Sequence, residues 1–360
     1  MSRQSPPPPV PPRFGAGVTN AAPLGEGTSA GAPPHTDQAP RPVILHGSPA
    51  TPPPFGPGTT PGDQVGPGVP TPAAGAPPEQ PFHHLDVLWL QVAGTLCNLA
   101  CTHCFVTCGP KETRHGMMTH ADVMARFAEA RLLGVNEVYL TGGEPFLNPE
   151  LERIVDDLIE RSPVTILTNG TLLTRARVAW LAERSRQSRF ALELRVSLDG
   201  TDAAAHDVFR GAGAWRRALD GLRALVAAGL LPIVTVTRPD HEDARAFAAR
   251  CSAVLRAEGI PEPRLKLLPM FRLGREVART GPYPAGHTLA QLGHETFDAN
   301  RLQCGSCRAV TSKGVYVCPL LVDEPGGRMA DTLADSARAF PLAHSACATC
   351  WATGMSCANH

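Results

Sequence analysis

The sequence predicts an α/β fold with parallel strands, on two observations. From residue 86 onward, short apolar runs of strand length alternate with stretches whose apolar residues recur at helical spacing. Six strand segments follow one another, with helical segments and short connections between them. Such a series favours parallel strands joined by right-handed crossovers, so we expect either an open doubly wound sheet or a barrel, whole or partial.

Each predicted element has its own local signal. The strands are apolar and of the usual length, and Thr119 and the pair Asn148-Pro149 are typical starts of the first two helices. Apolar residues spaced three and four apart mark the buried face of each helix. The predicted strands are 87–93, 136–143, 164–170, 191–200, 232–237 and 264–270, and the predicted helices begin after Thr119 and Asn148 and then cover 174–184, 215–228 and 244–258.

Polar and glycine-rich residues follow the first four strands. The first strand is followed by a cysteine-rich loop, and the next three by Gly142-Gly143-Glu144-Pro145, Thr168-Asn169-Gly170 and Ser197-Leu198-Asp199-Gly200. In both candidate architectures the loops beyond the carboxyl ends of the strands form the functional face. The site is therefore expected at this edge of the sheet.

The composition limits the class of protein. Residues 1–80 hold more than half of the 37 prolines and show little apolar periodicity, so we expect them to be disordered. Lys plus Arg and Asp plus Glu number 33 each, which argues against a nucleic-acid partner. No signal peptide and no apolar run of about 18 residues is present, so neither export nor a membrane span is expected. Eleven cysteines in a sequence without an export signal predict reduced thiols, metal ligation and a cytoplasmic location.

Four cysteines lie close together after the first strand. Cys97, Cys101 and Cys104 have the spacing C-x3-C-x2-C, which allows three thiolates to bind one face of a cubane iron–sulfur cluster and leaves the fourth iron open. A zinc site is the alternative, with His103 or Cys108 as its fourth ligand. Cys251, by contrast, lies on the apolar side of a predicted helix and is interpreted as a core residue.

Six further cysteines lie near the end of the sequence. We interpret 276–360 as a small module held together by metal, appended to a core domain at 81–275. A zinc ribbon and a dithiol redox pair formed by Cys347 and Cys350 are alternatives. The predicted metal ligands of this module are Cys304, Cys307, Cys318, Cys347, Cys350 and Cys357.

The motifs together resemble those of the radical S-adenosylmethionine (SAM) enzymes. C-N-L-A-C-T-H-C, then G-G-E-P, then S-L-D-G with H-D-V-F-R-G occur in the family's order. The resemblance implies a partial (β/α)6 TIM-like barrel in which Cys97, Cys101 and Cys104 hold a [4Fe–4S] cluster that chelates SAM. It further implies SAM contacts from the residues that match those motifs, namely Gly142, Gly143 and Glu144 to its amino group, Ser197 to its ribose, Arg210 near its carboxylate and Phe105 near its adenine.

The cysteine-rich tail is similar to the SPASM and twitch extensions, which bind one or two auxiliary iron–sulfur clusters. It departs from their pattern in two places. Gly314 precedes Cys318 by four positions where the family usually has five, and no cysteine follows Cys357. The number of auxiliary clusters therefore stays open.

The resemblance implies reductive cleavage of SAM to a 5′-deoxyadenosyl radical and modification of a peptide or protein by hydrogen abstraction. Maturation of a cofactor or small molecule by the same chemistry is an alternative. A zinc-binding structural or interaction protein without SAM chemistry is an alternative of another class. An electron donor such as flavodoxin or ferredoxin is an expected partner. The sequence assigns no catalytic residue beyond these cofactor contacts.

Overall fold

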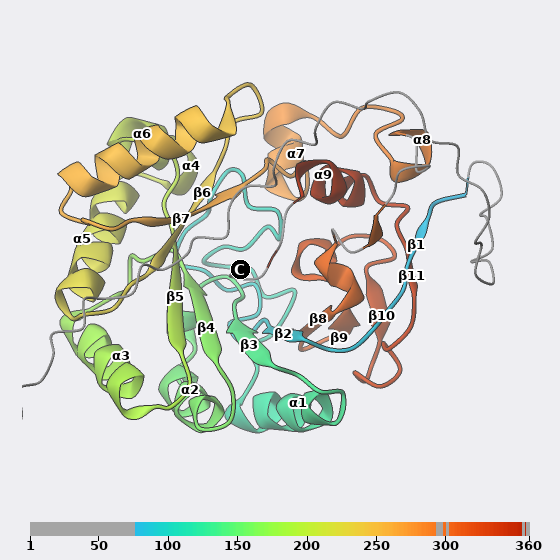
Figure 1. Cartoon of the computed structure of the whole chain (residues 1–360), viewed down its shortest axis with the longest axis horizontal. Coiled ribbons are helices and arrows are strands. Elements are labelled where there is room, and N and C mark those ends of the chain that lie inside the picture. Colours follow the sequence, from blue (N-terminus) through green and yellow to red (C-terminus); the bar gives the residue numbers. More distant parts are fainter. Residues whose placement is uncertain (1–75, 293–297, 300–301, 355–356, 358–360) are drawn as a thin grey trace, which may run out of the picture. The chain divides into compact units, whose positions relative to one another are not determined.

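The computed structural model describes residues 76–292, 298–299, 302–354 and 357. Most of the N-terminal segment predicted to be disordered lies outside the described residues. The described part consists of a curved sheet whose outer face carries helices, followed by a C-terminal portion beside the first strand of the barrel (Figure 1). The predicted α/β class with parallel strands is confirmed.

One nine-stranded sheet forms the centre of the described chain, in the order β10-β9-β8-β2-β3-β4-β5-β6-β7. Strands β2 to β7 are parallel neighbours in sequence order, which is the arrangement expected of consecutive strand–helix units. The strands are β2 (Val87–Leu90), β3 (Glu137–Leu140), β4 (Val164–Thr168), β5 (Leu192–Ser197), β6 (Ile233–Thr237), β7 (Arg264–Leu268), β8 (Cys307–Thr311), β9 (Gly314–Tyr316) and β10 (Arg328–Ala330), with a separate pair β1 (Glu79–Gln80) and β11 (Phe340–Pro341).

Side-chain caps mark the starts of several of the described helices. Thr119 accepts from the backbone of Asp122, whose side chain in turn accepts from the backbone of Thr119, and this reciprocal cap starts α1. Three later helices, α3, α4 and α6, have simpler caps. In each, the side chain of the capping residue accepts one backbone hydrogen bond; these residues are Thr174, Asp202 and Asp243. The helices are α1 (His120–Leu132), α2 (Leu151–Ile159), α3 (Arg175–Gln187), α4 (Ala203–Arg210), α5 (Ala214–Ala227), α6 (Ala244–Ala257), α7 (Arg275–Thr280), α8 (Leu289–Leu292) and α9 (Ser345–Thr353), with 3-10 turns η1 (Pro145–Leu147), η4 (Gln303–Gly305) and η5 (Pro319–Leu321).

The two faces of the curved sheet carry different side chains. On β2, Leu88 and Leu90 belong to the apolar core beneath the helices, whereas Val87 and Trp89 pack with the cysteine loop on the inner face. Alternate residues of a strand point to opposite faces, so one strand supplies both layers. The inner face therefore connects the strands directly to the cysteines.

The C-terminal part is continuous with the sheet. Strand β8 lies parallel to β2, with Val87 opposite Cys307 and Leu90 opposite Val310, and β9 returns antiparallel to β8. Periodicity did not predict this pairing, because β8 and β2 are far apart in the sequence. It also did not predict the short helices α4 and α7 or the helix α9.

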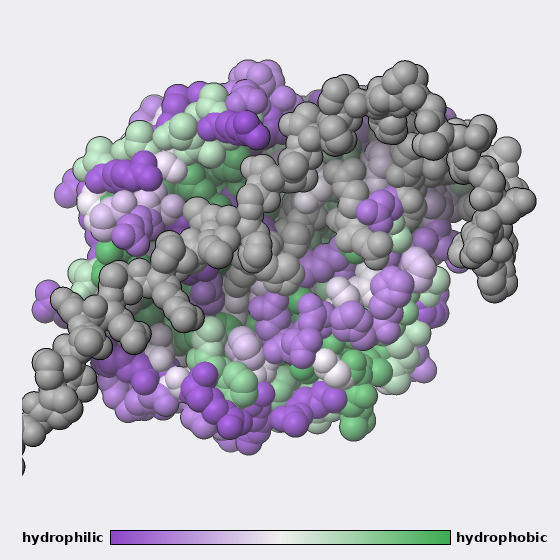
Figure 2. Space-filling view, viewed as in Figure 1, coloured by the Kyte–Doolittle hydropathy of each residue, from purple (hydrophilic) through white to green (hydrophobic). Residues whose placement is uncertain are grey.

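Hydrophilic and hydrophobic residues are mixed on the described surface in Figure 2. The large apolar side chains that are exposed, Leu132, Val208, Leu231 and Val277, come from four separate segments. Among the described residues, no helix has the length and apolarity needed to cross a membrane.

Candidate functional site

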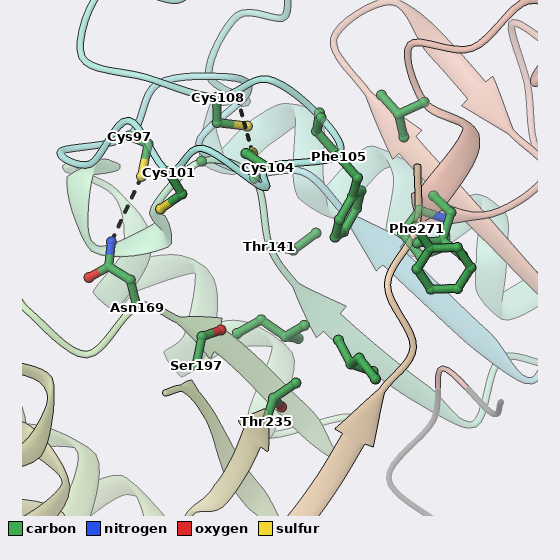
Figure 3. A pocket seen from close by; sticks show the side chains of 18 of the residues that line it. Cys97, Cys101, Cys104, Phe105, Cys108, Thr141, Asn169, Ser197, Thr235 and Phe271 are labelled. Atoms are coloured by element: carbon green, nitrogen blue, oxygen red, sulfur yellow. Dashed lines mark hydrogen bonds between the residues drawn. The ribbon is translucent and has the colours of Figure 1, made fainter. Parts of the chain in front are cut away.

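The cysteine loop and the carboxyl ends of the strands surround one cavity of about 220 Å³. In Figure 3 the side chains of Cys97, Cys101 and Cys104 lie along one side of it, and Asn169, Ser197 and Thr235 rise from the strands below. The predicted residues that line this cavity are Cys97, Cys101, Cys104, Phe105, Gly142, Gly143, Ser197 and Arg210.

Backbone hydrogen bonds hold the cysteine loop against the end of β3. The amide of Cys97 donates to the Gly109 carbonyl (3.1 Å), and the Glu144 amide donates to the Leu96 carbonyl (3.0 Å). A Cβ atom on Gly143 would lie only 2.0 Å from that Leu96 oxygen. Glycine is therefore required here because the two backbones touch, and the G-G pair fixes the start of the loop.

A short segment after β7 holds the other end of the loop. Arg275 donates from Nε to the Cys101 carbonyl (2.8 Å) and from Nη2 to the Cys108 carbonyl, and its backbone amide donates to the Cys104 carbonyl (3.0 Å). One arginine thus binds three carbonyls of the loop. No local pattern in the sequence indicated this role, because Arg275 lies far from the cysteines along the chain.

The thiols of the loop differ in their surroundings. Burial raises the pKa of Cys97 to about 12, although the Leu99 amide donates to its sulfur (3.4 Å). The Cys108 thiol donates to Cys104, which lowers the pKa of Cys104 to about 5. Cys108 is therefore a hydrogen-bond partner of one predicted cluster ligand, whereas the sequence named it only as a possible fourth ligand of a zinc site.

His103 is paired with a carboxylate on a neighbouring loop. Its Nε2 lies 2.9 Å from Asp199, and the same carboxylate oxygen accepts from Arg210 (2.6 Å). Asp199 is fully buried, and although burial favours its neutral form, Arg210 and His103 hold its pKa well below the ordinary value. The sequence named His103 only as a possible zinc ligand, whereas the structure places it in a buried polar group with Asp199 and Arg210. Arg210 lines the cavity while it is ion-paired with Asp199.

Glu144 occupies a different position from the glycines before it. Its carboxylate is fully buried and accepts from the Asn169 amide (2.8 Å), the Thr168 hydroxyl (2.8 Å) and the Phe146 amide (3.2 Å). Gly142 and Gly143 line the cavity, whereas Glu144 ties η1 to the end of β4. Its predicted contact with an amino group stays a prediction.

Phe105 and Phe271 both line the cavity and are labelled in Figure 3. Phe105 packs against the apolar cluster of the cysteine loop and also against that of the C-terminal part. It therefore joins the two regions and presents an aromatic face to the cavity.

The six C-terminal cysteines surround a second, smaller cavity of about 40 Å³. Burial raises the pKa of Cys304 and of Cys347 to about 12, so these thiols are neutral when nothing is bound. The cysteines come from η4, β8, the end of β9, α9 and the segment after it. Cys357 lines both cavities and so forms part of the wall between them.

Helix α9 carries Cys347 and Cys350 in its first turns. This is the placement typical of a redox pair, which was the alternative for these two residues, although the sequence did not predict the helix. A reactive thiol of that class needs a lowered pKa, but burial raises the pKa of both Cys347 and Cys350. The geometry therefore favours ligation over thiol exchange.

The donor sets of the two cavities fit iron–sulfur clusters better than single ions. Within the described residues, no three His, Cys, Asp or Glu side chains converge as ligands of one metal ion. In the first loop, His103 is engaged by Asp199 and so does not complete a four-ligand zinc site. Three cysteines around an open cavity suit a cluster that is ligated on three corners.

Comparison with known proteins agrees with this geometry. Residues 92–243 match the family model of the radical SAM superfamily. This segment, which runs from just after β2 to the residue before α6, is a radical SAM domain. The likeness of the tail to SPASM and twitch extensions lies outside the matched segment and stays a prediction.

Individual relatives fall into more than one activity class. The mycofactocin maturase MftC of Mycobacterium ulcerans (strain Agy99) is 32% identical over 167 residues, which is 44% of this chain and 43% of that protein. A probable GTP 3',8-cyclase of Halobacterium salinarum (strain ATCC 29341 / DSM 671 / R1) is 32% identical over 154 residues, 41% of this chain and 42% of that protein. The chain thus spans less than half the length of these two curated relatives.

A solved structure supports the fold alone. The structure of anSMEcpe with bound AdoMet has a TM-score of 0.50 to this chain at 14% identity, and the alignment covers 70% of this chain and 77% of that one.

Proposed function

We propose that the protein is a radical SAM enzyme that reductively cleaves SAM and removes a hydrogen atom from a peptide or protein substrate. The observation that carries the proposal is the convergence of Cys97, Cys101 and Cys104 with the G-G turn and Ser197 on one cavity. When bound, a [4Fe–4S] cluster and SAM supply one-electron cleavage of the sulfonium and a hydrogen-abstracting radical.

The protein's own residues bind and orient the cluster and SAM, and they exclude water from the cavity. Cys97, Cys101 and Cys104 are the proposed cluster ligands, and Gly142 and Gly143 let backbone groups approach the amino acid part of SAM. Ser197 supplies a hydroxyl for the ribose. Arg210 contributes positive charge at a position that Asp199 fixes.

Phe105, Met270 and Phe271 give the cavity an apolar wall. Such a wall keeps water away from a reactive species. We assign Phe105 the predicted packing near adenine on this basis.

The six C-terminal cysteines are proposed ligands of an auxiliary iron–sulfur group. All six line the same cavity, which favours one group over two. Because Cys357 also lines the first cavity, that group would lie next to the substrate.

Partners and location follow from the same chemistry. Reduction of the cluster requires a one-electron donor such as flavodoxin or ferredoxin. All eleven cysteines are free thiols, which suits a reducing compartment such as the cytoplasm. A peptide or protein substrate is favoured by the likeness to the MftC maturase, and a small molecule is the second candidate because of the likeness to the GTP 3',8-cyclase.

The test uses full-length protein with its clusters reconstituted without oxygen. Reduced enzyme with SAM is expected to form 5′-deoxyadenosine, and Cys101→Ala is expected to abolish this product because the cluster loses one of three ligands. Cys251→Ala is the matched control, since Cys251 is buried between Phe247 and Leu255 on α6. Formation of 5′-deoxyadenosine by Cys101→Ala at the control rate would refute the proposal.

A further inference from the structure

The inner face of the sheet carries a buried arginine at the floor of the first cavity. Arg195 lies on β5, two residues before Ser197 on the same face of the strand, and is only 3% exposed. Its Nη1 donates to the Cys357 carbonyl (2.7 Å) and its Nε lies 3.5 Å from the Thr235 hydroxyl. Both partners are neutral.

Burying a guanidinium costs several kcal/mol unless an anion compensates it. Within the described part of the chain, Arg195 forms no ion pair, and its Nη2 makes no hydrogen bond. The nearby carboxylates are engaged elsewhere, since Glu193 accepts from both terminal nitrogens of Arg264 (3.1 and 3.2 Å) and Glu137 accepts from the Tyr139 hydroxyl (3.0 Å).

Burial lowers the pKa of Arg195, and the acidic groups of Cys357, Glu137 and Glu193 oppose this effect, while a second cation lies close by. Lys266 on β7 is close enough for Arg195 to add to the effect of burial in lowering the Lys266 pKa to about 8. This part of the inner face therefore carries three basic side chains and two carboxylates. The basic residues are Arg195, Lys266 and Arg264, and the carboxylates are those of Glu193 and Glu137. Among the described residues that line the cavity there is no Asp or Glu.

Two further polar atoms in the cavity wall have no partner among the described residues. They are Nε1 of Trp89, a donor, and Oε1 of Gln91, an acceptor, on side chains only 3% and 5% exposed. Trp89 lies on the inner face of β2, Gln91 directly follows the strand, and both line the same cavity as Arg195. Unsatisfied buried polar groups are rare in native structures, and a functional role is one of the explanations for them.

We propose that Arg195 binds a carboxylate of the substrate at the floor of the cavity, with Trp89 and Gln91 available to a neighbouring N–H and C=O. The inference rests on the proposed function, because it concerns the substrate of that site. The planar fork of arginine suits a carboxylate, which accepts two parallel hydrogen bonds. The substrate class is therefore an N-acylated amino acid unit with a free carboxylate, either a chain terminus or an acidic side chain.

The experiment measures binding to the full-length holoenzyme with SAM present and no reductant. The probes are N-acetylphenylalanine and its amide for a terminal carboxylate, and N-acetylaspartic acid amide and N-acetylasparagine amide for a side-chain carboxylate. One acid is expected to bind about tenfold or more tightly than its amide, because bonds between charged groups are the stronger ones. Which of the two pairs shows this difference identifies the source of the carboxylate.

Three variants locate the effect. Arg195→Gln is expected to reduce the acid-to-amide preference to about one, and Arg195→Lys to retain part of it, since lysine keeps the charge but not the fork. Arg223→Gln removes an equal charge from an exposed position on α5 and should keep the full preference. Iron content and circular dichroism of each variant verify that it has folded.

Several results would overturn the inference. They are an acid that binds no better than its amide, a preference that survives in Arg195→Gln, or displacement of the acid by SAM, which would assign Arg195 to the SAM carboxylate. The measurement needs no turnover, so a failure to form 5′-deoxyadenosine would count against the proposed function and not against this subsite.

Discussion

At the residue scale, the best-defined group of the site is the buried set of His103, Asp199 and Arg210. One carboxylate oxygen of Asp199 contacts both His103 and Arg210, while its other oxygen accepts from the Thr237 amide (3.0 Å). The group connects the cysteine loop, the end of β5 and the end of α4. It fixes the position of the arginine that is expected near SAM.

Replacing this carboxylate should destabilise the protein strongly. Asp199→Asn removes the charge that compensates the buried Arg210, and the loss of one partner from a buried pair costs about 3–5 kcal/mol. The measurement is the free energy of unfolding of the full-length protein, obtained from urea titrations without oxygen that are monitored by circular dichroism.

Asp220→Asn is the matched control for this change. Asp220 pairs with Arg223 at 3.3 Å on the surface, so its loss should cost less than about 1 kcal/mol. Equal effects of the two substitutions would contradict the role assigned to Asp199.

At the element scale, the site depends on how closely the cysteine loop rests on the turn after β3. Gly143 has no Cβ, and the Leu96 carbonyl occupies the space where one would be. This contact fixes the backbone position of Leu96 and therefore of Cys97, the next residue. Arg275, at the start of α7, restrains the same loop from the other side.

Gly143→Ala should therefore displace the loop without unfolding the barrel. A Cβ 2.0 Å from the Leu96 oxygen forces one backbone to move, so we expect reduced iron content and loss of SAM cleavage. Both are measured on protein reconstituted without oxygen.

The control is Gly116→Ala, whose added Cβ would meet nothing closer than the Ser312 hydroxyl at 3.7 Å. It should keep the wild-type iron content. Full iron content in Gly143→Ala would show that the backbone contact does not position the ligands.

At the scale of the whole described molecule, a polar cluster ties the segment before α1 to the C-terminal part. Asp323, just after η5, accepts from Arg114 (2.6 Å) and lies 2.7 Å from Nε2 of His115, whose Nδ1 lies 2.9 Å from the Thr311 hydroxyl. These contacts join residues some 200 positions apart. They help β8 and β9 stay against the barrel.

This cluster predicts a pH dependence of stability. Burial favours the neutral form of Asp323, but His115 and Arg114 outweigh it and lower its pKa. A lowered folded-state pKa stabilises the protein above the unfolded pKa of about 4, and that stability is lost as the pH falls through the folded value.

The prediction is checked by unfolding experiments at a series of pH values from neutral to below about 4. Asp323→Asn should be less stable than the wild type near neutral pH, and the gap should narrow as the pH falls. Asp331→Asn is the control, because Asp331 is 84% exposed in its ion pair with Arg328. A gap that stays constant with pH would contradict the assignment to Asp323.

The sequence alone determined the order of the strands and helices and the edge of the sheet that carries the site. These features depend on local signals, namely apolar periodicity, capping residues and glycine turns, and neighbouring segments pair in sequence order. The placement of Cys97, Cys101, Cys104, Gly143 and Ser197 at one cavity follows from the same rule, because the carboxyl ends of parallel strands meet at one edge.

Only the tertiary structure decided which distant residues meet. The pairing of His103 with Asp199, the hold of Arg275 on the cysteine loop, and the addition of β8 to the barrel strands join segments that share no local pattern. The same is true of Arg195, whose position on a strand resembles that of any inward polar residue. Its character as a buried cation without a paired carboxylate depends on what all the other strands and the C-terminal segment leave around it.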